Sequence, residues 1–133
     1  MKLAHLIGTL AISTGVFAAA SPVSAADVAK EIATAETHAG YAAAAADLKM
    51  AQAHLHHVVN CMVGPKGRGY DETQANPCKD QGGGVMADYK GDKAKRATLQ
   101  KALDTARAGL KAADLTAAKQ RASDADALLK KAL

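Results

Sequence analysis

The chain has 133 residues, of which 49% are hydrophobic and 3% aromatic, and its 17 Lys and Arg against 13 Asp and Glu leave a formal net charge of +4. This length fits one small domain. The basic residues are interspersed with acidic ones and there is no Trp, so the chain lacks the basic stripe and aromatic platforms that nucleic-acid binding needs.

Residues 1–25 have the pattern of a secretory signal peptide. Lys2 precedes an apolar run, and the small residues Val23 and Ala25 occupy the positions that signal peptidase recognises before a cut after Ala25. A membrane anchor is the alternative, but the run is short for a bilayer span and no basic flank follows it. We therefore expect export to a bacterial periplasm, a soluble mature domain of residues 26–133, and no stable membrane insertion after cleavage.

The first half of the mature chain predicts two helices. Residues 26–38 form the first, with Asp27 as N-cap. The Ala-rich stretch that follows contains Gly40, and we expect a break within residues 39–46, although a helix that continues through the glycine is the alternative. The second helix starts around Asp47 and stops at Gly64. Its buried stripe consists of Leu48, Ala51, Leu55, Val58 and Met62.

The second half predicts a long irregular loop, about residues 64–91, followed by two more helices. Asp92 caps a helix to about Ala112, and Asp114 caps one that runs to the C-terminus. Two cysteines in an exported chain usually pair, so Cys61 and Cys78 predict a disulfide that tethers this loop. The expected fold is all-α: a small antiparallel four-helix bundle with one long disulfide-tethered loop.

The stretch from His54 to Cys61 is the strongest indication of function. It holds three of the four mature-chain histidines and one of the two cysteines. At about 100° per residue, one flank of the helix carries Met50, His54, His57 and Cys61. His56 lies on the other flank, and Asn60 is predicted to point mostly outward.

Imidazole and thiolate are standard ligands of transition metals, and two metal sites are possible. In the first, His54 and His57 bind with His38 from the neighbouring helix, with Met50 assisting and His54 favoured over His57 as the nearer partner of His38. In the second, a reduced Cys61 joins His57, which conflicts with the disulfide. We predict the first site, for copper, nickel or zinc, in a periplasmic protein of metal handling or tolerance.

Other functions are less favoured by the sequence. The main alternative is a non-catalytic role in the cell envelope, as a structural or protein-interaction helical bundle. Such a bundle could form a homodimer. Non-covalent haem through His54, His57 or Met50 lacks aromatic support, and the C-x-x-C-H motif of covalent haem is absent. An enzyme is not expected, because a disulfide removes the one nucleophile that His57 would activate, Cys61.

The stretch HLHHVVNCMVGPKGRGYD, followed by NPC and later by DYKGD, resembles an uncharacterised family of small exported bacterial helical proteins. The resemblance covers roughly residues 38–92 and the Ala-rich helices after them, and it implies no particular activity. The chain is also loosely similar to small periplasmic metal-binding helical bundles. Those carry a repeated His pattern on several helices, whereas here the histidines are confined to His38 and the cluster at residues 54–57.

Overall fold

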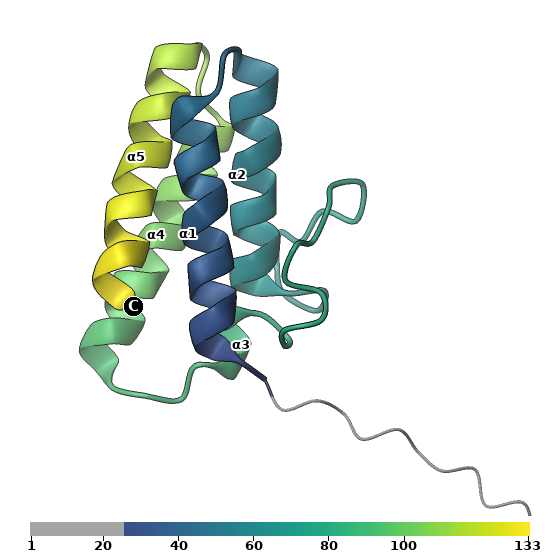
Figure 1. Ribbon diagram of the computed structural model, residues 1–133, viewed down its shortest axis with the longest axis vertical. Coiled ribbons are helices and arrows are strands. Elements are labelled where there is room, and N and C mark those ends of the chain that lie inside the picture. The colour runs from purple at the N-terminus through teal and green to yellow at the C-terminus, as the bar shows by residue number, and fades with distance from the viewer. Residues whose placement is uncertain (1–25) are drawn as a thin grey trace, which may run out of the picture.

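The computed structural model describes residues 26–133, which fold into five helices and contain no strand (Figure 1). The predicted signal peptide, residues 1–25, lies outside the described part. The helices are α1 (Val28–Ala44), α2 (Leu48–Val63), α3 (Val85–Asp88), α4 (Lys93–Leu110) and α5 (Leu115–Ala132). Within residues 26–133 no helix is both long enough and apolar enough to cross a bilayer.

An aspartate caps the N-terminus of each long helix. The side chains of Asp27, Asp47, Asp92 and Asp114 each accept a hydrogen bond from the backbone N–H three residues further on. This bond satisfies one of the free N–H groups of the first turn and places a negative charge at the positive end of the helix dipole. The helix starts predicted from these residues are thereby confirmed.

The first helix is longer than predicted. It was expected to end near His38, but α1 continues through Gly40 to Ala44. The predicted break between the two helices exists, at residues 45–47, which overlap the end of the expected range of 39–46. Glycine in a helix costs about 1 kcal/mol relative to alanine. Ala39 and Ala42 on either side are fully buried, so packing outweighs that local cost.

The four long helices lie side by side (Figure 1), and all four contribute residues to the main hydrophobic core. α1 packs against α2 and α5, and α4 packs against α5 and α2. Alanine provides many of the buried positions and lets the helix axes approach closely. At Gly109 the approach is tighter still, because a Cβ there would lie 2.7 Å from the Cδ1 atom of Leu55. The largest fully buried aliphatic side chains of the core are Ile32, Leu55, Val58, Val59, Met62, Val85, Leu99 and Leu129.

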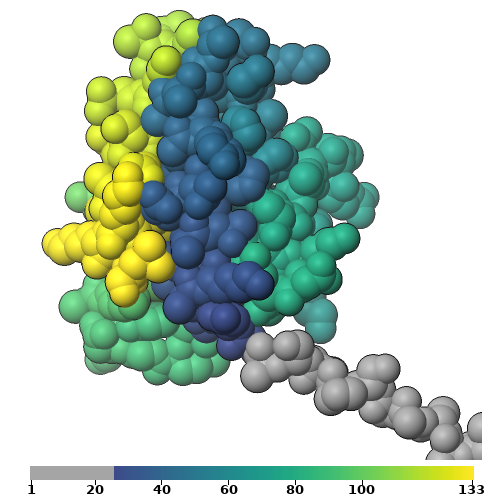
Figure 2. Space-filling model, viewed as in Figure 1, coloured from purple at the N-terminus to yellow at the C-terminus, as the bar shows by residue number. Residues whose placement is uncertain are grey.

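The connection between α2 and α4 was predicted to be irregular throughout, which is wrong at one place. The short helix α3 interrupts it, and Val85 of that helix is fully buried in the core. The predicted disulfide joins Cys61 of α2 to Cys78 of the loop. In the space-filling view the loop packs directly against the side of the bundle formed by α1 and α2 (Figure 2). It is therefore a structured part of the domain.

Candidate metal centre

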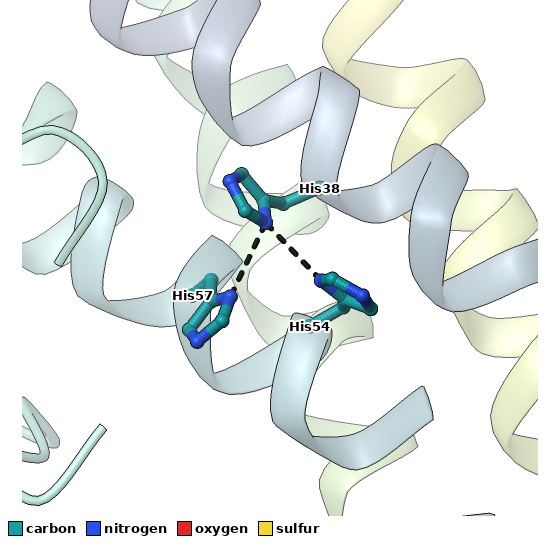
Figure 3. A group of neighbouring side chains, drawn as sticks. All are labelled: His38, His54 and His57. Carbon is teal, nitrogen blue, oxygen red and sulfur yellow. Dashed lines mark hydrogen bonds between the residues drawn. The ribbon is translucent and has the colours of Figure 1, made fainter. Parts of the chain in front are cut away.

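Three imidazoles from two helices converge on one point (Figure 3). His38 comes from α1, and His54 and His57 lie three residues apart on the facing side of α2. The Nδ1 atom of His38 is 3.3 Å from Nδ1 of His54 and 3.2 Å from Nδ1 of His57. One nitrogen from each ring lies within 4.8 Å of the nitrogens from the other two, and in the described part of the chain this is the one group of His, Cys, Asp or Glu with that property.

These separations suit a metal ion. A Zn–N bond measures about 2.0–2.1 Å, so two nitrogens on one tetrahedral ion lie roughly 3.3 Å apart. The two distances from His38 match that spacing without a rotamer change. His38 lies equally close to both partners, so the expectation that it would favour His54 over His57 is wrong. The reason is that His54 and His57 are almost one helical turn apart, and a ring placed between them reaches both.

The surroundings of the triad keep two of its rings, His38 and His57, neutral. Burial, followed by the neighbouring rings of His57 and His54, lowers the pKa of His38 from 6.5 to about 4. Burial also lowers the pKa of His57, with smaller effects from His54 and His56. A neutral imidazole offers a lone pair to a metal, whereas a protonated one does not. At neutral pH these two rings are therefore in the form that binds metal.

A fourth aromatic ring, missed in the sequence analysis, flanks the triad. The Tyr41 ring centroid lies 5.6 Å from that of His38 and 5.4 Å from that of His54. Tyr41 follows His38 by three residues on α1, so helical spacing alone places it on the same face. The three-residue spacing could have predicted that Tyr41 lies beside His38. It did not, because the helix was expected to end near His38, before Tyr41.

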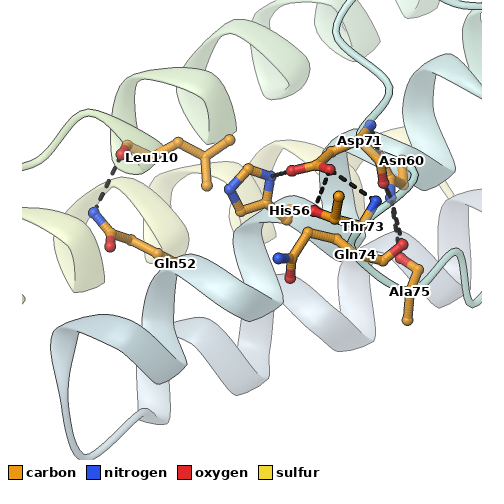
Figure 4. A network of polar contacts seen from close by, with 8 residues as sticks. All are labelled: Gln52, His56, Asn60, Asp71, Thr73, Gln74, Ala75 and Leu110. Atoms are coloured by element: carbon orange, nitrogen blue, oxygen red, sulfur yellow. Dashed lines mark hydrogen bonds and ion pairs between the residues drawn. The ribbon is translucent and has the colours of Figure 1, made fainter.

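The other predicted ligands have different positions. Met50 is 46% exposed and lies one turn before His54 on α2. Cys61 is fully buried and bonded to Cys78, so the alternative site with a Cys61 thiolate does not exist in the oxidised protein. His56 points away from the triad, as predicted, and its Nδ1 lies 3.5 Å from a carboxylate oxygen of Asp71 (Figure 4).

Asn60 was predicted to point outward, which is wrong. It is fully buried, and both the oxygen and the nitrogen of its side-chain amide form hydrogen bonds with the backbone of the loop (Figure 4). Its Oδ1 accepts from the backbone N–H of Asp71, and its Nδ2 donates to the carbonyls of Asp71, Gln74 and Ala75. The loop covers this polar flank of α2, so a side chain that is exposed on an isolated helix becomes an internal tether.

The comparisons with known proteins add no family. No protein-family model matches the chain, and no curated protein or solved structure matches it.

Proposed function

We propose that this protein binds one transition-metal ion through His38, His54 and His57, in a periplasmic role of metal handling or tolerance and without catalysis. The observation that carries the proposal is the position of the His38 Nδ1 atom, which lies 3.2 Å from the Nδ1 of His57 and 3.3 Å from the Nδ1 of His54. An all-nitrogen set suits copper, nickel and zinc. Met50, one turn from His54, supplies a fourth ligand for ions that accept a thioether.

The metal-free triad is an unsatisfied arrangement, which supports this proposal. A neutral imidazole has one N–H and one lone pair on different nitrogens. The Nδ1 of His38 faces two other Nδ1 atoms at once, and with a single N–H or a single lone pair it makes one good hydrogen bond at most. A bound cation accepts all three lone pairs and removes this conflict.

The proposed location and architecture have separate support. The Cys61–Cys78 disulfide suits an oxidising compartment, and the sequence of residues 1–25 suits export. We propose an antiparallel four-helix bundle formed by α1, α2, α4 and α5, since short connections join α1 to α2 and α4 to α5. In that architecture each histidine lies in the middle of a rigid helix.

Calorimetric titration of the oxidised mature protein with Zn(II), Cu(II) and Ni(II) tests the proposal. We expect one ion per chain, with Kd below about 10 μM for at least one metal. His54→Ala and His57→Ala should each weaken binding at least tenfold. His56→Ala is the matched control, because it removes an imidazole from the same helix outside the triad and should leave Kd within about twofold. Binding weaker than 10 μM for all three metals, or an equal effect of all three substitutions, would overturn the proposal.

A further inference from the structure

The Tyr41 ring occupies one side of the triad. It contacts the rings of His38 and His54, edge-on to the first with an interplanar angle of 83° and tilted by 56° to the second. Among the ring pairs within residues 26–133, Tyr41 has no such contact with His57. Tyr41 therefore lies along the edge of the triad between His38 and His54, with its own side chain 54% exposed.

The position of the Tyr41 ring bears on how many water molecules can bind to an ion held by the triad. Three imidazoles supply three ligands, and each remaining coordination position must be filled by water or by a neighbouring side chain. Zn(II) is satisfied with one further ligand in a tetrahedral set. Ni(II) in its six-coordinate tetragonal arrangement needs three further ligands beyond the three imidazoles. A ring in contact with two of the three imidazoles reduces the room beside the triad for those extra waters.

We propose that Tyr41 is a specificity-determining residue of the His38–His54–His57 site, whose ring restricts a bound ion to low coordination number and so favours Zn(II) over Ni(II). This inference rests on the proposed function, because it concerns the ion held by the triad. In this proposal the ring acts by its bulk, and the phenol oxygen has no role. Tyr41 is exposed on its outer side, so its replacement leaves the buried core unchanged.

The test is the ratio of the Kd for Ni(II) to the Kd for Zn(II), measured by competition with a chromophoric chelator. A general loss of structure weakens both metals and leaves the ratio unchanged. We expect Tyr41→Ala to lower the ratio at least fivefold and Tyr41→Phe to leave it within about twofold. Tyr89→Ala, which removes a tyrosine that contacts Asp92 outside the triad, is the control and should also leave the ratio unchanged.

A second readout counts the ligands directly. Co(II) in the wild-type site should give the intense visible bands of a four-coordinate ion, and in Tyr41→Ala the weak bands of a six-coordinate ion. Tyr41→Ser replaces the alanine variant if the latter fails to fold. An unchanged ratio in Tyr41→Ala, or a fall in Tyr41→Phe equal to that in Tyr41→Ala, would overturn the inference. Wild-type protein that binds neither metal would instead overturn the proposed function, and the inference with it.

Discussion

The Nδ1 atoms of His38 and His57 lie 3.2 Å apart across the α1–α2 interface, although 19 positions separate the two residues in the chain. Burial lowers the pKa of both imidazoles, and other nearby histidines lower it further: His57 and His54 for His38, and His54 and His56 for His57. Both rings are thus held neutral beside each other, which links the stability of the metal-free protein to pH.

We expect the metal-free protein to lose stability as the pH falls from 6.5 to about 4. Within this range the unfolded His38 takes up a proton, whereas the folded ring, with its pKa lowered to about 4, stays neutral. The unfolded state then binds more protons, so the free energy of unfolding rises with pH. Discounted for solvent screening, the effect of His38 is about 1 kcal/mol, or roughly 5 °C in Tm.

The measurement is the Tm with chelator present at pH 7 and at pH 4.5, for the wild type and for His38→Gln. The difference in Tm between the two pH values should be smaller in the variant, which does not titrate at this position. Equal differences in both proteins would show that His38 is not the group responsible.

Asn60→Ala should lower the free energy of unfolding by about 2–4 kcal/mol, because it removes four hydrogen bonds between the buried Asn60 amide and the part-buried backbone groups of the loop. Urea unfolding followed by circular dichroism measures this loss. His56→Ala removes the partly exposed contact to Asp71 from the same helix and should have little effect. A loss below 1 kcal/mol for Asn60→Ala would contradict the role of this residue as the tether of the loop.

Reduction of the disulfide should destabilise the protein by about 3 kcal/mol, the loop-closure entropy for a separation of 17 residues. The comparison is urea unfolding of the wild type and of the double variant Cys61→Ser/Cys78→Ser. Zn(II) affinity should stay within about threefold in the folded double variant, because the three histidines remain on their helices. A much tighter Zn(II) complex in the reduced wild type would instead point to Cys61 as a ligand.

Two glycines should respond in opposite directions to alanine. Gly40→Ala should stabilise the protein by about 0.5–1 kcal/mol, since the nearest atom to the new Cβ is 3.9 Å away and alanine favours helix. Gly109→Ala should destabilise it by about 1–3 kcal/mol, since its Cβ would lie 2.7 Å from Leu55 Cδ1. Thermal unfolding of the two variants gives the comparison, and the same sign for both would refute this packing argument.

Met50→Leu should weaken Cu(I) binding about tenfold and change Zn(II) binding less than twofold. A thioether is a soft ligand that prefers Cu(I), and leucine preserves its size and hydrophobicity. Competition with a Cu(I) chelator under ascorbate gives the first affinity, and Met50 is exposed enough for the substitution to leave the fold intact. An unchanged Cu(I) affinity would remove Met50 from the ligand set.

Local signals in the sequence were sufficient for the starts of the four long helices and for the helix flank that carries His54 and His57. The aspartate caps set the helix starts through hydrogen bonds within the first turn, and the apolar spacing of α2 marks its buried face. Gly64, with its φ of 65°, sets the end of α2 through local backbone geometry. The spacing of His54 and His57 on one flank follows from the helix alone, as does the separation of His56 from them. The pairing of the two cysteines followed from their number and from the expected export.

Contacts between distant segments decided the rest. The end of α1 depends on the burial of Ala39 and Ala42 against neighbouring helices, so the local cost of Gly40 did not predict it. Asn60 is buried only because the loop returns over α2. Val85 lies in the short helix α3, where its side chain packs into the core of the bundle. His38 was a possible ligand by residue type alone, and the register of α1 against α2 placed its Nδ1 between two others. Register arises from side-chain packing summed over the whole interface, which no local stretch of sequence contains.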